Sequence, residues 1–258
     1  MLLDGKVAIV TGAAGSIGRA IGLALAAEGA ALALVDLPQA AATETVAEQI
    51  RGHGCQASVI PADISNPAMV QQMVASVMQE FGRIDILVNN AGLTNRAPVL
   101  EVTEEKLRQL FDVDVFGTFF CSQAVAPHMM ELGRGKIINI SSISAELGTT
   151  TMVPYCAAKA AVNMLTRGLA MVFAPYNICV NAIAPGVVET ERVHARFANP
   201  RNKDEVLART PRRKITQPAD LGGVAVLLAS DLADEITGQI IVVDGGYTLQ
   251  GPEWTPFT

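Results

Sequence analysis

The chain has 258 residues, half of which are hydrophobic and 17% of which are charged, and its formal net charge at pH 7 is −6. A single α/β domain often has this length, and the apolar content is sufficient for a large core. The acidic balance argues against nucleic acid or an anionic membrane as a partner, because both require a basic surface.

The N-terminal residues lack the basic start and the long apolar run of a signal peptide, and no window approaches the ~20 apolar residues of a membrane span. The four cysteines are scattered without a Cys-x-x-Cys pair: Cys55, Cys121, Cys156 and Cys179. We therefore expect reduced thiols in a cytoplasmic protein. The three histidines are isolated and show no metal-ligand spacing, so we expect no catalytic metal.

The first predicted strand and helix enclose a glycine-rich turn. Residues 6–11 form a short apolar run typical of a buried parallel strand, and a helical pattern covers about residues 17–28. Between them lie Gly12, Gly15 and Gly18. Glycine permits a tight turn and lets the backbone approach a pyrophosphate, while the following helix N-terminus offers free N–H groups. The turn therefore predicts a dinucleotide phosphate site, because both flanking elements are present.

A second predicted strand, residues 31–36, ends on Asp36. A carboxylate about 20 residues after the glycines commonly accepts from the adenosine ribose hydroxyl. It would also repel a 2′-phosphate, and neither Gly15 nor Leu37 supplies a cation to attract one. The sequence therefore favours NAD over NADP. The alternative is that Asp36 only caps the following helix.

The rest of the chain continues to alternate between strands and helices. Further strands are predicted over residues 57–60, 85–89, 136–140, 177–183 and 239–243. Further helices are predicted over residues 39–51, 67–81 after a cap at Ser65 or Asn66, 104–131 after a cap at Thr103, 155–173 and 218–229. This alternation predicts one domain with a Rossmann-type, doubly wound parallel sheet and helices on both faces.

Residues 188–216 are the least regular part of the chain and carry many charges. Ligands of such sheets lie beyond the carboxyl ends of the strands, and this segment leaves one of those ends. We interpret it as a mobile lid over the substrate. Its charges have a simpler explanation as a solvated face.

Ser142, Tyr155 and Lys159 form the candidate catalytic stretch. Tyr155 and Lys159 are four residues apart on a predicted helix and therefore share a face. A free tyrosine titrates near pH ~10 and is a poor base at neutral pH. An ammonium at ~4 Å, in an effective dielectric of ~20, stabilises a phenolate by about 4 kcal/mol, enough for proton transfer near neutral pH. The alternative is an ordinary helix that happens to carry both residues.

Taken together, these motifs resemble the short-chain dehydrogenase/reductase family over essentially the whole chain. The residues that carry the resemblance are Thr11, Gly12, Gly15, Ser16, Gly18, Asp36, Asp63, Asn89, Asn90, Ala91, Gly92, Ser142, Tyr155, Lys159, Pro185, Gly186, Val187, Val188, Thr190, Asp244, Gly245 and Gly246. Their order and spacing together make coincidence a poor explanation.

The resemblance implies a role for each position. Ser142 would orient the substrate oxygen, Tyr155 would be the general acid/base, and Lys159 would assist it and bind the nicotinamide ribose. The remaining cofactor contacts that it implies are Gly12, Gly15, Ser16, Ile17 and Gly18 at the phosphates, Asp36 at the adenosine ribose, Asp63 and Ile64 near the adenine, Asn90, Ala91 and Gly92 near the second ribose, and Pro185, Gly186, Val188 and Thr190 at the carboxamide.

Two positions depart from the family pattern. Ser16 stands where the family usually has glycine, and we expect it to alter cofactor binding without abolishing it. Asp114 stands where the family usually has an asparagine that holds a water beside the lysine. An ionised carboxylate accepts hydrogen bonds but does not donate them. We expect an ion pair with Lys159, a relay water held largely by backbone, and a shifted pH profile, unless Asp114 faces elsewhere.

The resemblance implies an NAD(H)-dependent oxidoreductase that interconverts a secondary alcohol and its ketone. Two alternatives stay open: an NADPH-dependent carbonyl or 3-oxoacyl reductase, and a non-catalytic scaffold that binds NAD. The helices over residues 107–130 and 152–174 are apolar nearly all round, which predicts that a neighbouring subunit covers their outer face. The resemblance implies a homotetramer or a homodimer built through these helices, and we expect the homotetramer. The aromatic tail after Gly246 either closes a pocket or packs on its own surface.

Overall fold

The computed structural model describes residues 1–249 and is built around a seven-stranded parallel sheet with strand order β3-β2-β1-β4-β5-β6-β7. The strands are β1 Val7–Thr11, β2 Ala31–Asp36, β3 Ala57–Pro61, β4 Ile86–Asn89, β5 Gly135–Ile140, β6 Ile178–Pro185 and β7 Ile240–Val243. The central strands are buried along their whole length, as their near-continuous apolar sequences require. The predicted doubly wound fold is confirmed.

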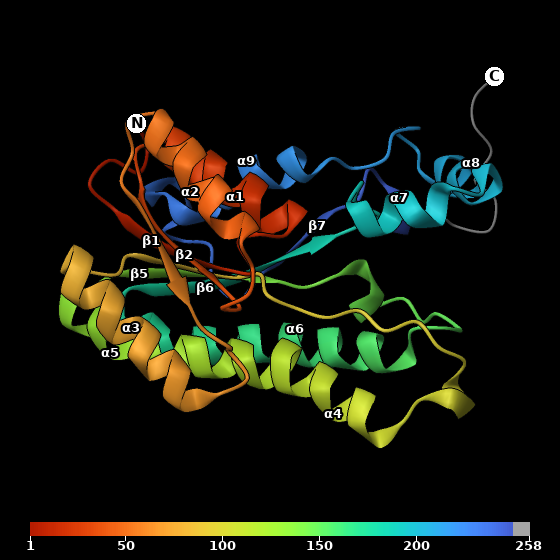
Figure 1. Cartoon of the computed structure of the whole chain (residues 1–258), viewed down its shortest axis with the longest axis horizontal. Coiled ribbons are helices and arrows are strands. Elements are labelled where there is room, and N and C mark those ends of the chain that lie inside the picture. The colour runs from red at the N-terminus through yellow and green to blue at the C-terminus, as the bar shows by residue number, and fades with distance from the viewer. Residues whose placement is uncertain (250–258) are drawn as a thin grey trace.

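Helices cover both faces of the sheet (Figure 1). One layer contains α1 Ser16–Ala27, α2 Ala42–Gly52 and α9 Pro218–Ala229. The other contains α3 Pro67–Phe81, α4 Glu104–Phe111, α5 Thr118–Leu132 and α6 Val153–Phe173. Each layer buries its own apolar core against the sheet, with Ile21 and Leu34 in the first and Met73 and Val125 in the second. Strand β1 contributes side chains to both cores, and the strand order changes direction between β1 and β4.

The prediction of one continuous helix over residues 104–131 is wrong, because the helix is interrupted next to the candidate site. A π-helical segment, Asp112–Gly117, separates α4 from α5. Gly117 lies in this segment where a Cβ would come within 2.6 Å of the Ile64 side chain. The wider π turn places Asp114 on the buried side of the helix. Such turns are hidden from a sequence pattern, since they change the helical period over only a few residues.

The segment predicted to be least regular contains two helices, α7 Glu191–Phe197 and α8 Pro200–Arg209. Thr190 and Asn199 accept hydrogen bonds from the first turns, so both helices begin at recognisable caps. Their short, polar sequences conceal them from a search for apolar periodicity. Val206 is 4% exposed and anchors α8 to the body, while both helices extend beyond the carboxyl ends of the strands (Figure 1).

Helix α6 leaves large apolar side chains exposed on its outer side, including Met164 at 62%, Met171 at 81% and Val172 at 60%. Phe116, in the neighbouring π segment, is 49% exposed. This is the face on which we predict contact with other subunits, and the homotetramer stays a prediction that light scattering tests. No helix within residues 1–249 is long and apolar enough to cross a membrane. Most of the aromatic tail, residues 250–258, lies outside the described residues.

Candidate active site

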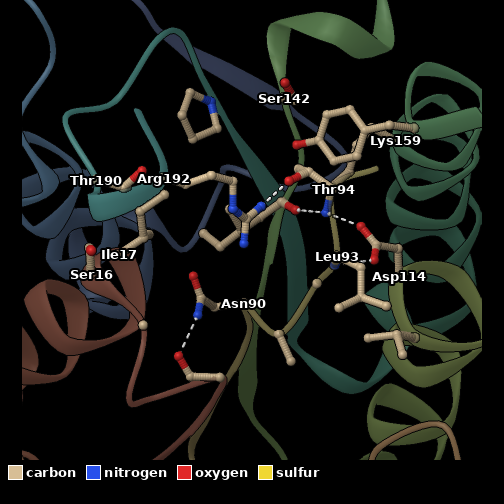
Figure 2. Close-up of a pocket in the computed structure, with 18 of the residues that line it drawn as sticks. Ser16, Ile17, Asn90, Leu93, Thr94, Asp114, Ser142, Lys159, Thr190 and Arg192 are labelled. Carbon is tan, nitrogen blue, oxygen red and sulfur yellow. Dashed lines mark hydrogen bonds and ion pairs between the residues drawn. The ribbon is translucent and has the colours of Figure 1, made fainter. Parts of the chain in front are cut away.

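The predicted motifs, although far apart in the sequence, meet in one cleft of about 1610 Å³ at the carboxyl ends of the strands (Figure 2). The cleft is lined by the glycine-rich turn, by the ends of β2, β4, β5 and β6, and by the start of α6. The predicted site residues on its wall are Gly12, Gly15, Ser16, Ile17, Asp36, Asp63, Ile64, Asn90, Ala91, Gly92, Asp114, Ser142, Tyr155, Lys159, Pro185, Gly186, Val188 and Thr190. Gly18 is the exception, because it is buried behind the turn.

The glycine-rich turn depends on two close backbone approaches. Gly12 has φ of +64°, and a Cβ there would come within 2.8 Å of Ala91 Cα. A Cβ on Gly18 would lie 2.3 Å from the Gly12 carbonyl oxygen. Gly18 therefore shapes the turn from behind. Asn90 also supports the turn, because its side-chain amide donates to the carbonyls of Thr11 at 2.9 Å and Gly12 at 3.0 Å.

Helix α1 begins at this turn with no side-chain cap, since its N-cap residue is Gly15. The first N–H groups of a helix have no partner within the helix, so they are available to an anion in the cleft. Ser16 and Ile17 line the cleft at this point, and Ser16 adds a hydroxyl (Figure 2). A glycine turn lets a ligand come close to the backbone, and an uncapped helix start offers free N–H groups. Both features fit the pyrophosphate of a dinucleotide.

Two carboxylates are held at the far end of the cleft. Asp36 Oδ2 accepts a hydrogen bond from the Ala14 N–H at 2.8 Å, and Oδ1 accepts from its neighbour Leu37 at 2.9 Å. Asp63 Oδ1 accepts from both the backbone and the hydroxyl of Ser65. Each carboxylate is half-buried and retains acceptor positions toward the cleft. The arrangement fits the adenosine end of a dinucleotide.

The three candidate catalytic residues lie around the opposite end. Ser142 is 8% exposed, and its hydroxyl accepts from the Ser144 N–H at 3.1 Å. Lys159 is 6% exposed and donates to the Ile140 carbonyl at 3.0 Å. Its Nζ lies 5.7 Å from the centre of the Tyr155 ring. Helix α6 thus presents a half-buried phenol to the cleft with a fixed ammonium beside it.

Asp114 faces this ammonium, so the possibility that it points elsewhere is wrong. Asp114 is fully buried, and its Oδ2 lies 3.0 Å from Lys159 Nζ (Figure 2). This oxygen has no partner at a hydrogen-bonding angle, so we describe the contact as an ion pair. The other oxygen accepts from the Leu93 N–H at 2.6 Å. The pKa of Lys159 is lowered by burial but raised by the charges of Asp114 and Tyr155, and the net direction is upward.

Comparison with known proteins now adds to this geometry. Residues 12–248 match a family model described as enoyl-(acyl carrier protein) reductase. The chain is 43% identical over 256 residues to the sorbitol dehydrogenase of Cereibacter sphaeroides, which covers 95% of this chain and 98% of that one. The chain belongs to the short-chain dehydrogenase/reductase family.

Two further relatives extend the comparison. This short-chain dehydrogenase/reductase is 40% identical over 248 residues to the D-threitol dehydrogenase of Mycolicibacterium smegmatis, covering 96% of this chain and 95% of that one. The crystal structure of a gluconate 5-dehydrogenase from Burkholderia cenocepacia J2315, in complex with NADP and tartrate, matches it with a TM-score of 0.92 at 38% identity. That match covers 96% of this chain and 97% of the other.

A buried polar network behind the candidate catalytic residues was not predicted from the sequence. Asn89 and Asn139 are paired across β4 and β5, and the Asn89 amide donates to Asn139 Oδ1 at 2.9 Å. Asn139 in turn donates to Thr166 on α6 at 2.9 Å. Asparagines at the ends of two successive predicted strands were the available signal. The network ties α6 to the sheet just below Lys159.

Residues 1–249 contain no group of three or more His, Cys, Asp or Glu side chains arranged to hold a metal ion.

Proposed function

We propose that this protein is an NAD(H)-dependent oxidoreductase that interconverts a secondary alcohol and its ketone. The observation that carries the proposal is the placement of Tyr155 on the wall of a glycine-lined cleft with the buried Lys159 ammonium 5.7 Å from its ring. A phenol positioned in this way suits general acid/base catalysis at the oxygen of the substrate.

The proposed chemistry divides between the cofactor and the chain. When bound, the nicotinamide ring supplies the site that accepts or gives the hydride. Ser142 donates a hydrogen bond that orients the substrate oxygen, and Tyr155 takes the proton from the alcohol or returns it to the ketone. Lys159 stabilises the phenolate form of Tyr155 through its positive charge, which Asp114 partly offsets.

The names of the relatives support a polyhydroxylated substrate. They include a sorbitol dehydrogenase, a D-threitol dehydrogenase and a gluconate 5-dehydrogenase. These compounds share a chain of secondary alcohols, one of which would be oxidised. We therefore propose a polyol or a sugar acid as the substrate class, with α7 and α8 forming the cover over it.

Asp36 supports NAD as the cofactor, because its carboxylate at the adenosine end would repel a 2′-phosphate. A specific observation favours the NADPH alternative, in which the protein is a carbonyl or 3-oxoacyl reductase. Arg19, in α1, also lines the cleft and supplies a cation there. The related gluconate 5-dehydrogenase structure contains NADP. Steady-state rates with NAD and NADP separate the two, and a strong preference for NADP would contradict the role given to Asp36.

A panel of secondary alcohols tests the function itself. We expect NADH absorbance to appear with at least one polyol or sugar acid, and Tyr155→Phe to abolish that signal while NADH binding persists. Turnover that survived in Tyr155→Phe would contradict the mechanism. The absence of turnover with every member of the panel, despite NADH binding, would favour the non-catalytic scaffold.

A further inference from the structure

Three arginines from two separate parts of the chain line the substrate end of the cleft. Arg96 lies in the loop that follows β4, and Arg192 and Arg196 belong to α7. The two on α7 are four residues apart and therefore share one face of the helix. All three line the same cleft as Ser142 and Tyr155.

The side chains of α7 already reach across this cleft. The Arg192 guanidinium donates a hydrogen bond to the hydroxyl of Thr94 on the opposite wall (Figure 2). Arg96 donates to Thr151 at 3.4 Å, on the segment that leads into α6. Both hydrogen bonds go to neutral hydroxyl groups. They hold the guanidinium groups near the substrate without neutralising them.

The three arginines have no carboxylate partner in the part of the chain that the structure describes. Within residues 1–249, no carboxylate comes within 4 Å of Arg96, Arg192 or Arg196, although Arg108 on the same wall pairs with Glu104 at 2.7 Å. The pKa of Arg96 is lowered, first by burial and then by the charge of Arg196, so these two groups repel each other. Like charges brought together without a counter-ion favour the binding of an anion.

A neutral polyol has no negative charge to pair with these three arginines. Guanidinium groups bind carboxylate and phosphate oxygens through paired N–H donors, and this geometry distinguishes an oxyanion from a hydroxyl. We propose that the substrate carries an anionic oxyacid group, a carboxylate or a phosphate ester, which Arg96, Arg192 and Arg196 bind while the reacting alcohol lies at Tyr155. The inference rests on the proposed function, because it assigns the two ends of the substrate to opposite parts of the same site.

The anion also connects the two walls. Arg192 and Arg196 approach it from α7, and Arg96 approaches it from the loop after β4. An anionic substrate therefore holds α7 over the cleft, whereas a neutral polyol makes no such connection.

Matched ligands test this inference directly. Gluconate, sorbitol 6-phosphate and sorbitol share most of their hydroxyl groups but differ in charge. In the presence of NADH, we expect one or both of the anionic compounds to bind at least about tenfold more tightly than sorbitol by calorimetry, and to weaken as salt rises. Comparison of gluconate with sorbitol 6-phosphate identifies the carboxylate or the phosphate. Equal affinity for sorbitol, or no binding of either anion, would overturn the inference.

Arginine variants locate the effect. Arg196→Gln and Arg96→Gln should each raise the Kd of the preferred anion by about tenfold and leave NADH binding unchanged. Arg201→Gln is the control, because Arg201 is exposed on α8 and does not line the cleft, yet the change in net charge is the same. An equal loss in Arg201→Gln would mean that the whole protein's field, rather than this cluster, attracts the anion, and would overturn the assignment.

The same experiments separate this inference from the proposed function. If Tyr155→Phe loses turnover but still binds the anion, both stand. If wild-type protein binds the anion through Arg196 but oxidises no panel member, the function fails and the anion site stands. If neutral polyols alone are oxidised and the arginine variants have no effect, the function stands and the anion site fails.

Discussion

The two ends of the cleft are built in different ways. At the end that we propose binds the cofactor, the glycine-rich turn, the uncapped start of α1 and the Asp36 carboxylate lie within residues 12–36 and present mainly backbone groups. At the substrate end, side chains converge from the loop after β4, from the π segment, from α6 and from α7. One continuous stretch of chain therefore supplies most of the proposed cofactor end, with support from Asn90 and Ala91, whereas the proposed substrate end combines several distant segments.

This difference predicts how each end responds to substitution. A site made of backbone groups loses affinity when an added atom keeps the ligand away from the backbone, whatever the polarity of that atom. A site made of converging side chains loses the particular charge or proton that each residue supplies and otherwise keeps its shape.

The largest effect is expected at the substrate end from Tyr155→Phe. Removal of the hydroxyl removes the proton acceptor, and loss of general acid/base catalysis costs about 10²–10⁴-fold in rate. We expect kcat to fall by this factor while the Kd for NADH changes little, measured by fluorescence titration. A comparable loss of NADH affinity would show that the two ends are not separable.

Gly18→Ala tests the cofactor end. Its Cβ would lie 2.3 Å from the Gly12 carbonyl oxygen, so the turn must shift. We expect the Kd for NADH to rise at least about tenfold and the Tm to fall, because the steric conflict is with backbone. Gly223→Ala in α9 is the control, since a Cβ there meets nothing within 4 Å and alanine favours a helix by ~1 kcal/mol. Equal changes in Kd and Tm in Gly18→Ala and Gly223→Ala would contradict a role for Gly18 in shaping the turn.

Asp36→Asn removes one charge at the same end while keeping an oxygen for the Ala14 N–H. We expect the ratio of kcat/KM for NAD to that for NADP to fall by about tenfold, because the repulsion of a 2′-phosphate is relieved. A ratio that did not change would mean that Asp36 organises the glycine-rich turn through the Ala14 N–H without selecting the cofactor. The alternative that Asp36 only caps the following helix is wrong, because the N-cap residue of α2 is Ala41 and the helix has no side-chain cap.

Asp114→Asn is expected to have the smallest effect on rate and a distinct effect on pH dependence. The raised pKa of Lys159 keeps it charged at neutral pH, and the stabilisation from this pair is lost only as pH rises through that value, above the ordinary ~10.4 of lysine. Without Asp114, the burial of Lys159 is less opposed and its pKa falls, while a phenolate beside it is better stabilised. Both changes move the pH profile of kcat/KM toward acid, by about one unit.

Asp112→Asn provides the matched control for this variant. Asp112 belongs to the same π segment and lines the cleft, but makes no ion pair with Lys159. We expect its profile to move much less. Equal shifts in both variants, or no shift in Asp114→Asn, would contradict a specific role for the pair.

The architecture and most residues of the candidate site could be predicted from the amino-acid sequence. The glycines, Asp36 and the Tyr155–Lys159 spacing were recognisable because each acts over one turn or one strand, where chain order dictates spatial order. The sequence pattern did not reveal the buried Asn89–Asn139 pair or the two polar helices α7 and α8, because neither produces an apolar period.

Which side chains line the proposed substrate end is visible only in the folded structure. Asp114 lies in a π-helical segment that the sequence pattern does not reveal, and its Oδ2 is 3.0 Å from Lys159 Nζ. That Arg96 meets Arg192 and Arg196 depends on the sheet, which brings the end of β4 opposite α7 across the cleft. Folding brings these charges to the wall of one cleft, where we propose that they bind an anion. The sequence does not show this, because their electrostatic energy depends on distance and burial rather than on order along the chain.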